Sequence, residues 1–350
     1  NFFRLIRIDD RLNKFYIKHF LQYFYHTGEI VNYQGSSNNL RNLKFKEYVQ
    51  INIPIPPFSE QQRIVAKLDA LFGHLEALRT RLDRIPQLLK NFRQQVLTQA
   101  VTGKLTEEWR GGVEIKNWTS TSIGSFEVLL TSGSRGWAKY YSDHGAYFIR
   151  AQDIKHDVLK IEDAAFVSLP KSAEGRRTRV HQGDILITIT GANVTKTAYV
   201  HSDFEVEAYV NQHVALLRLN EKVYSPYLHL FLTCESHGRL SLLSLAYGLG
   251  KPQLNLDNIR KVQVNLPPLA EQREIVDRVS HLFKLVDKIE AQYQSVKAKI
   301  DTLPQAILTK AFKGDLVSQD PNDEPARVLL ERIKWPSGTM EKKWQEEATE

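Results

Sequence analysis

The sequence is poor in cysteine and has no long apolar segment. Cys234 is the only cysteine among 350 residues, so neither disulfide bonds nor a cysteine-rich zinc site can organise the fold. No apolar run approaches the roughly 18–20 residues that a membrane-spanning helix needs, and no signal-peptide pattern is present. Hydrophobic residues make up 42% of the chain and charged residues 25%, which is typical of a globular protein. We therefore expect a protein of two or three domains in a reducing compartment such as the cytoplasm.

The chain has an excess of positive charge, which favours a polyanionic partner. Its formal net charge is +7 and its pI is about 9.2. Residues 1–50 contain eight Lys and Arg against four acidic residues, whereas residues 118–266 contain 16 against 14. A basic surface on the second of these segments would therefore have to arise from folding rather than from composition.

One phrase occurs twice, 211 residues apart. "PIPPFSEQQRIV" at 54–65 aligns with "NLPPLAEQREIV" at 265–276, and the alignment extends without a gap over 1–105 and 212–316. This indicates two supersecondary assemblies of one design. Residues from about 118 to 211 have no upstream counterpart, and Met340 is the only methionine. We therefore expect the first unit to lack its N-terminal half.

Each copy continues into a long helix with one narrow apolar stripe. Ten apolar residues per copy are spaced alternately four and three residues apart, which is the 3.5-residue period of a coiled-coil seam. Two such stripes in one chain predict an antiparallel helix pair, with a globular unit at each end of a rod. The predicted seam consists of Ile64, Leu68, Leu71, Leu75, Leu78, Leu82, Ile85, Leu89, Phe92 and Val96, and of Ile275, Val279, Leu282, Val286, Ile289, Tyr293, Val296, Ile300, Leu303 and Ile307.

The ends of the two long helices also carry recognisable signals. Ser59 and Gln62 match a capping box, which predicts that the first helix runs from Ser59 to about Val101. Prolines inside the two stripes predict a kink in each helix. Glycines beyond the last seam residues predict where the helices end. These prolines and glycines are Pro86 and Pro304, and Gly103 and Gly314.

The segment 111–266 is dominated by short β-branched and apolar runs separated by turns. "GAYFIRAQDI" and "GDILITITG" are typical of strands, and "SPYLHLFLTCES" is typical of a short helix that begins at Ser225 and Pro226. The predicted fold class is therefore α+β, with strand-rich globular domains joined by the helix pair in a pseudo-twofold repeat.

Polar and cationic residues of this segment gather in its predicted loops. Guanidinium, ammonium and amide groups on loops are what phosphate contacts and base-edge recognition require. Any one of these residues is more often an ordinary surface residue, but as a set in a basic chain they favour nucleic acid. The candidate DNA-binding residues are Ser134, Arg135, Trp137, Lys139, Arg150, Gln152, Arg176, Arg177, Arg179, Asn193, Thr195, Lys196 and Lys251.

No motif for catalysis or for a metal is present. The sequence contains no P-loop, no H-E-x-x-H and no G-x-S-x-G, and "GLGK" at 248–251 lacks the further glycine of either nucleotide-binding motif. An Asn-Pro-Pro-aromatic motif of base methylation is also absent, and the histidines lack ligand-like spacing. The sequence therefore predicts a protein that is not an enzyme.

Several of these phrases together resemble the DNA specificity (S) subunit of type I restriction-modification systems. They are the two Pro-Pro-x-x-Glu-Gln phrases, the helix endings "VLTQAVTGKL" and "ILTKAFKGDL", the strand "GDILITITG" and the terminal "EPARVLLERI". The resemblance implies a non-catalytic protein of the bacterial or archaeal cytoplasm that recognises a bipartite double-stranded DNA site. It also implies partnership with two methyltransferase (M) subunits and with restriction-translocase (R) subunits. S-adenosylmethionine would be bound by the M subunit, and this chain would bind no cofactor or metal.

The resemblance also implies a division of the chain. Residues 1–57 match the C-terminal part of a first target recognition domain, 58–110 the first conserved spacer helix and 111–266 a second recognition domain. Residues 267–318 match the second spacer helix, and 319–350 form a tail with a short helix. Each recognition domain would read one half-site, and the helix pair would set the half-site spacing. The Glu-Gln pairs at 60–61 and 271–272 are expected to be exposed, where they could cap their helices or contact the M subunit.

Two alternatives to this function follow from the sequence. A coiled-coil scaffold that binds proteins would explain the two stripes but not the basic charge. A self-contained methyltransferase with an unrecognised site is the other alternative. Salt-dependent DNA binding would separate DNA recognition from the scaffold, and binding of S-adenosylmethionine by the isolated chain would support the enzyme.

Overall fold

The computed structural model describes residues 4–37, 40–112, 117–133, 135–170, 175–248, 250 and 252–333. The chain divides into two compact units. Unit 1 consists of Asn1–Ile85 and Ala291–Glu350, and unit 2 of Pro86–Glu290. The long helix α8 (Leu269–Phe312) contributes to both, so each unit is described with its own part of this helix.

Unit 1 is mainly helical. Its core contains Tyr16 and Ile17 of α1 together with Ile64 and Leu68 of α3 and Leu308 of α8. Asn13 caps α1, because its side chain accepts hydrogen bonds from the backbone N–H groups of the second and third helical residues. The elements of unit 1, besides α8, are α1 (Lys14–His26), β1 (Gln34–Ser37), β2 (Leu40–Leu43), α2 (Phe45–Tyr48), α3 (Phe58–Leu82) and α9 (Ala326–Ile333).

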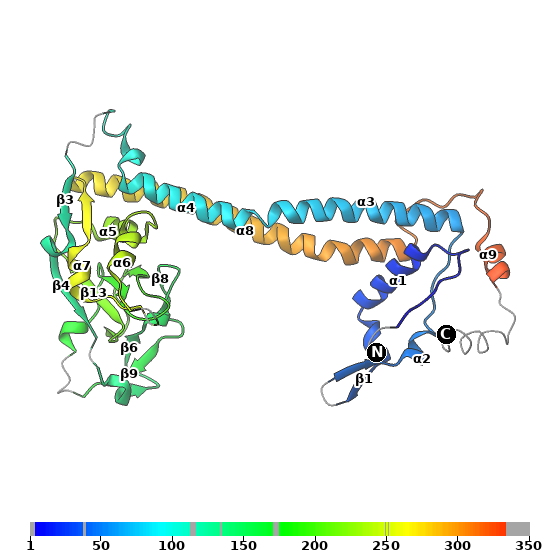
Figure 1. Ribbon diagram of the computed structural model, residues 1–350, viewed down its shortest axis with the longest axis horizontal. Helices are drawn as coiled ribbons and strands as arrows, with labels where there is room; N and C mark the ends of the chain where they lie inside the picture. Colours follow the sequence, from blue (N-terminus) through cyan, green and yellow to red (C-terminus); the bar gives the residue numbers. More distant parts are fainter. Residues whose placement is uncertain are drawn as a thin grey trace. The chain divides into compact units, whose positions relative to one another are not determined.

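Within unit 1, α3 and the last part of α8 lie side by side and run in opposite directions (Figure 1). Leu68 near the start of α3 packs with Leu308 near the end of α8. Farther along, Arg79 of α3 lies 3.7 Å from Asp301, which precedes Leu308 on α8. These contacts confirm the predicted antiparallel pairing for this part of the seam.

Unit 2 contains two four-stranded sheets. The central sheet has the strand order β11-β10-β13-β4 and is antiparallel throughout. The second sheet has the order β12-β6-β9-β5, in which β12 and β6 are parallel. Their strands are β4 (Glu127–Ser132), β5 (Tyr141–Ser142), β6 (Ala146–Ile149), β9 (Ala165–Val167), β10 (Ile185–Thr188), β11 (Thr197–Tyr199), β12 (Ala208–Val210) and β13 (Val214–Leu219).

Smaller elements complete unit 2. Two short antiparallel pairs are formed by β3 with β14 and by β7 with β8. The remaining elements are β3 (Thr119–Ser122), β7 (Ile154–Lys155), β8 (Val158–Leu159), β14 (Gln263–Leu266), α4 (Ile85–Val101), α5 (Ser225–Thr233), α6 (Gly238–Leu245) and α7 (Leu256–Lys261), with short 3₁₀ helices η4 (Trp137–Tyr140), η5 (Ala151–Asp153) and η6 (Arg176–Thr178).

The central sheet is buried on both faces. Alternate residues of β10 point to opposite sides, because side chains alternate along a strand. Ile185 and Ile187 belong to the core that includes α5 and the helix pair, whereas Leu186 belongs to a second core shared with Ile149 of β6. This mixture of long helices and strand-rich layers confirms the predicted α+β class.

The helix pair of unit 2 consists of α4 and the first part of α8. Val96 and Ala100 of α4 belong to the same core as Ile275 and Val279 of α8. Nearer the middle of both helices, Arg93 of α4 donates a hydrogen bond of 2.6 Å to a carboxylate oxygen of Asp287 on α8. The two helices therefore run antiparallel here as well.

The seam residues are buried unevenly. Nine of the twenty are buried, and five are exposed by about two fifths of their surface, because a two-helix pair covers only one side of each stripe. The buried ones are Ile64, Leu68, Leu75, Val96, Ile275, Val279, Val286, Tyr293 and Ile300, the exposed ones are Leu78, Phe92, Ile289, Val296 and Leu303, and Leu71, Leu82, Ile85, Leu89, Leu282 and Ile307 are intermediate.

Two predictions about the helix ends need correction. The first helix begins at Phe58 after Pro57 and has no side-chain cap, so the capping box at Ser59 was wrong. It is also interrupted after Leu82, and α4 begins at Ile85. Pro86 is therefore the second residue of a helix. A proline is tolerated there, because the first N–H groups of a helix have no acceptor within the helix. The helix α8, in contrast, continues through Pro304, and the apolar contacts of Ile300 and Leu308 on either side support it.

Candidate nucleic-acid interface

Four strand ends meet at one edge of the central sheet of unit 2. The strands β4 and β10 end at this edge and β11 and β13 begin there, because neighbouring strands are antiparallel. Thr188 of β10 pairs with Val214 of β13, and Ser132 of β4 pairs with Ala215. The segments 133–137, 189–196 and 211–213 therefore extend from one end of the sheet.

A fourth segment, 247–253, joins the same edge. The backbone N–H of Gly191 donates to the carbonyl of Pro252 at 3.0 Å. Gln253 forms backbone bridges with Thr190 and Tyr247. The described residues of these four segments are called the loop edge below.

Several predicted DNA-binding residues lie on or beside the loop edge. Arg135 and Asn193 have exposed side chains, and Lys196 is partly exposed. Arg177 of η6 reaches the end of β4, where it donates a hydrogen bond to the hydroxyl of Thr131. The structure thus brings together donors that are up to 61 positions apart in the sequence.

Other predicted residues are engaged within the fold. Trp137 is buried and stacks on Phe148 with ring centroids 5.8 Å apart, so it belongs to the core of the second sheet. Arg150 pairs with Asp153 at 2.9 Å, and this hydrogen-bonded contact raises the pKa of its guanidinium. Thr195 is buried with a φ of 70°, which makes it a turn residue rather than a ligand contact.

The remaining predicted residues are exposed, contact neighbouring side chains or lie outside the described part of the chain. Arg179 is exposed and pairs with Glu207 at 2.8 Å. Gln152 is exposed on η5, and the ammonium of Lys139 lies 4.9 Å from the ring centroid of Tyr140. Ser134, Lys251 and the side chain of Arg176 lie outside the part of the chain that the structure describes.

The structure adds Gln212 and His213, which sequence reasoning missed. They connect β12 to β13 at the loop edge, and the Nε2 atoms of the two side chains are 3.1 Å apart. Gln212 is exposed and could reach a base edge with an amide. A signal was present in the sequence, because Asn-Gln-His is a polar triplet between two apolar runs.

The repeated Glu-Gln pairs are buried, which corrects the expectation that they are exposed. Glu60, Gln61, Glu271 and Gln272 are all less than a tenth exposed. The amide of Gln272 accepts a hydrogen bond from the backbone N–H of Tyr224 and donates to the carbonyl of Pro267. These pairs therefore hold the start of each long helix against its globular unit.

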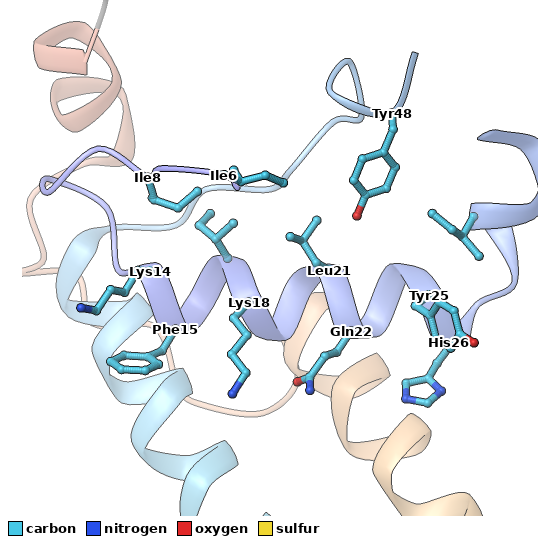
Figure 2. Close-up of a pocket in the computed structure, with 12 residues that line it drawn as sticks. Ile6, Ile8, Lys14, Phe15, Lys18, Leu21, Gln22, Tyr25, His26 and Tyr48 are labelled. Atoms are coloured by element: carbon cyan, nitrogen blue, oxygen red, sulfur yellow. The ribbon is translucent and has the colours of Figure 1, made fainter. Parts of the chain in front are cut away.

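A cavity of about 750 Å³ lies in unit 1 beside α1. Figure 2 shows Ile6 and Ile8 of the N-terminal segment and Tyr48 on one side of α1, with Leu21 facing them. None of the twelve described lining residues is a carboxylate, a serine or a cysteine. The lining therefore offers no carboxylate for acid–base chemistry, and its polar groups include Lys14, Lys18 and His26.

The described residues also lack a metal-binding cluster and a membrane-spanning helix. No group of three or more His, Cys, Asp or Glu among them is arranged to hold a metal ion. Likewise, none of the helices in the described ranges is long and apolar enough to cross a membrane. Cys234 is buried, with its sulfur 3.3 Å from the hydroxyl of Ser236.

Comparison with known proteins identifies the family. The sequence model described as "Type I restriction modification DNA specificity domain" matches residues 1–87 and 142–298. The StySPI specificity subunit of Salmonella potsdam is 32% identical over 332 residues, which cover 91% of this chain and 71% of that protein. The EcoBI specificity subunit of Escherichia coli is 31% identical over 349 residues, covering 93% and 72%.

Solved structures agree on the fold. A chain from a study of the assembly and conformational transition of the type I R-M system matches with a TM-score of 0.69 at 21% identity, covering 89% of this chain and 74% of that one. The HsdS subunit of Thermoanaerobacter tengcongensis matches with a TM-score of 0.58 at 21% identity, covering 89% and 73%. The family match supports DNA specificity over the coiled-coil scaffold and over a self-contained methyltransferase. The chain belongs to the type I restriction-modification DNA specificity family, in which it is a non-catalytic specificity subunit.

Proposed function

We propose that the loop edge of unit 2 reads one half of a bipartite DNA site. The observation that carries this proposal is the convergence of four segments at one end of the central sheet, three of which carry exposed or partly exposed cationic or amide side chains. Arg135 and Lys196 supply cations for phosphates, while Asn193 and Gln212 supply amides for base edges. The net charge of +7 adds a general attraction to DNA.

The helix pair is proposed to dock the methyltransferase subunits. Its sides expose large apolar residues that neither helix of the pair covers, and such stripes are typical of interaction surfaces. The exposed residues are Leu78, Val296 and Leu303 in unit 1, and Leu88, Phe92, Leu285 and Ile289 in unit 2. S-adenosylmethionine would be bound by those partners, and R subunits would complete the restriction complex.

Substitutions on the loop edge test the DNA contact. Asn193→Ala and Gln212→Ala should each relax discrimination at one base pair by about tenfold, because a bidentate amide contact with a base would be lost. Lys196→Ala should weaken binding to all duplexes and reduce the salt dependence, because a phosphate contact would be lost. These effects are measured by mapping methylation sites and by DNA titrations with the chain assembled with its M subunit.

A matched control is available at the opposite end of the same sheet. Lys222 is an exposed lysine just beyond the end of β13, so Lys222→Ala removes the same charge away from the loop edge. Its binding and target sequence should stay unchanged. If Asn193→Ala, Gln212→Ala and Lys196→Ala all behave like Lys222→Ala, the proposed interface is wrong.

The spacing between half-sites is proposed to depend on the length of the helix pair. Inserting four residues near Thr80 of α3 and four near Lys299 of α8 adds about 6 Å to both antiparallel helices of unit 1. The spacer between methylated half-sites should then lengthen, whereas inserting the residues in the 319–323 segment should leave it unchanged. An unaltered spacer in the lengthened variant contradicts the role of the helices as a ruler.

A further inference from the structure

The hairpin β7–β8 of unit 2 has an unusual turn. Ile154 pairs with Leu159 and Lys155 with Val158, so His156 and Asp157 form a two-residue connection. Their φ angles are 52° and 62°, the left-handed region that such turns require and that Asn-Gly normally occupies. Residues with a side chain at both positions are disfavoured there. Contacts of Asp157 beyond the hairpin compensate for this disfavoured conformation.

The carboxylate of Asp157 receives donors from three other parts of unit 2. One oxygen accepts a hydrogen bond from the backbone N–H of Thr197, the first residue of β11, at 3.1 Å. The same oxygen lies 2.5 Å from a guanidinium nitrogen of Arg239 on α6. The other oxygen lies 4.0 Å from the ammonium of Lys196. Arg239 has only 7% of its side chain exposed, so this ion pair is shielded from solvent.

These donors belong to elements that adjoin two segments of the loop edge. Lys196 ends the 189–196 turn that presents Asn193, and Thr197 follows it as the first residue of β11. Arg239 is the second residue of α6, and the other end of this helix leads into the 247–253 segment. The two segments also contact each other. The backbone N–H of Gly191 donates to the carbonyl of Pro252, and the backbone N–H of Leu254 donates to the carbonyl of Ile189. The carboxylate of Asp157 thus connects β11, which follows the 189–196 turn, with α6, which precedes the 247–253 segment.

We infer that Asp157 and Arg239 are positioning residues for DNA recognition. Their ion pair holds the 189–196 turn and the 247–253 segment in fixed positions relative to each other. The polar groups of the two segments then present a fixed pattern to the base edges. Neither residue has to touch DNA for this role. The inference rests on the proposed function of the loop edge.

A second ion pair in the same sheet provides a matched control. Arg218 of β13 donates two hydrogen bonds of 2.8 Å to Asp184, which precedes β10 and is 1% exposed. This pair is as well formed as that of Asp157, but it lies at the end of β10 remote from the loop edge. A change there disturbs the sheet without loosening the recognition segments.

The experiment compares Asp157→Asn with Asp184→Asn in the full chain, assembled with its M subunit. Methylation rates are measured on the target duplex and on duplexes with single base changes in the half-site assigned to unit 2. Binding to a duplex without a target and the midpoint of thermal unfolding are measured in parallel. Asp157→Asn should reduce discrimination between right and wrong bases by about tenfold, while binding to the non-target duplex changes less than about twofold. Asp184→Asn should lower the unfolding midpoint and leave discrimination unchanged.

Arg239→Lys keeps the experiment decisive if Asp157→Asn does not fold. Lysine keeps the charge but loses the planar fork of arginine, so the same loss of discrimination is expected in a milder form. Unchanged discrimination in both Asp157→Asn and Arg239→Lys, or an equal loss in Asp184→Asn, overturns the inference. If Asn193→Ala, Gln212→Ala and Lys196→Ala also have no effect, the proposed function itself fails. If those three have their effects, only the positioning role fails.

Discussion

The two copies of the repeat can be compared at the start of their long helices. In unit 1 the amide of Gln61 accepts a hydrogen bond of 2.9 Å from the backbone N–H of Asn13 and donates one of 2.9 Å to the carbonyl of Pro56. In unit 2, 211 positions later, Gln272 accepts from Tyr224 at 2.7 Å and donates to Pro267 at 2.9 Å. Each glutamine ties the long helix to the start of a shorter helix, α1 in unit 1 and α5 in unit 2, and to the Pro-Pro segment.

A tyrosine repeats in the same way. The hydroxyl of Tyr16 donates to the carbonyl of Pro54 at 2.8 Å, and that of Tyr227 donates to the carbonyl of Asn265 at 2.9 Å. Burial raises the pKa of both phenols, so each stays protonated and a hydrogen-bond donor at neutral pH. We call this arrangement of glutamine and tyrosine the joint.

The surroundings of the two joints differ. Leu216 and Leu217 of β13 are fully buried in the cores of unit 2, whereas their counterparts Leu5 and Ile6 are 74% and 44% exposed. Ile6 lines the cavity beside α1 shown in Figure 2. The joint therefore has the same hydrogen bonds in both units, although these neighbouring residues are buried in one unit and exposed in the other.

The largest expected effect comes from removing the glutamine of either joint. Gln272→Leu keeps the size of the side chain but leaves a buried N–H and a buried carbonyl without partners, at a cost of about 4 kcal/mol in the free energy of unfolding. Gln61→Leu should cost the same. Hydrogen–deuterium exchange of peptides over 10–20 and 222–232 reports each joint separately.

The neighbouring position supplies the control for this prediction. Gln62 is exposed, so Gln62→Leu should change the stability by less than about 0.5 kcal/mol. If one of the two buried glutamines tolerates leucine as well as Gln62 does, the joints are not equivalent.

The second prediction concerns a histidine that only one copy has. His229 of α5 packs against β11, and burial lowers the pKa of its imidazole from 6.5 to about 4. Asp157, His201 and Arg239 are the charged or titratable groups facing it. Because the folded pKa lies below the unfolded one, the stabilisation is present above pH 6.5 and is lost as the pH falls towards 4. The free energy of unfolding falls by about 3 kcal/mol once the pH is below the folded pKa.

The measurement is a pair of urea denaturation series at pH 7.5 and pH 5.0. Wild-type protein should lose about 2 kcal/mol more than His229→Leu between these pH values, because leucine does not titrate. The counterpart in unit 1 is the exposed Lys18, so Lys18→Leu should leave the pH dependence as it is in the wild type. If the free energy of unfolding of His229→Leu depends on pH as strongly as that of the wild type, the dependence comes from groups other than His229.

Much of the helix pair could be predicted from the sequence, because a 3.5-residue period and a repeat are directly visible in it. The interruption after Leu82 could not be predicted from the sequence. Each stripe contains one proline, Pro86 or Pro304, and the sequence does not show that the first helix is interrupted near its proline while the second continues through it. Their different outcomes depend on where each helix starts and on the apolar contacts around Pro304. The capping box failed for a similar reason, because Phe58 already lies in the helix that Ser59 was expected to begin.

The candidate site could be predicted as loops but not as a surface. The convergence at the loop edge depends on strand register, such as Thr188 opposite Val214, which alternation of residues does not reveal. Trp137 was predicted to bind DNA, yet it fills the core of the second sheet. Asp157 was not chosen, because its importance comes from contacts with residues 40 and 82 positions away.

The last prediction uses the glutamate beside each joint. Glu271 accepts hydrogen bonds from the hydroxyl of Thr106 at 2.7 Å and the indole N–H of Trp118 at 3.0 Å, and it pairs with Arg110. In unit 1 the buried Glu60 lies near Arg63, whose guanidinium pairs with Asp323 at 2.6 Å. Glu271 thus has a cation bonded directly to it, whereas the arginine near Glu60 pairs with another carboxylate.

Neutralising the two glutamates should accordingly have effects of different size. Glu271→Gln removes the charge with which the largely buried Arg110 pairs and should cost about 2 kcal/mol in the free energy of unfolding. Glu60→Gln should cost less, because Arg63 keeps its pair with Asp323. Urea denaturation of both variants tests the contrast, and a double-mutant cycle with Arg110→Met isolates the Arg110–Glu271 term. Equal costs at the two sites would mean that the glutamates, like the glutamines, belong to the joint itself rather than to what surrounds it.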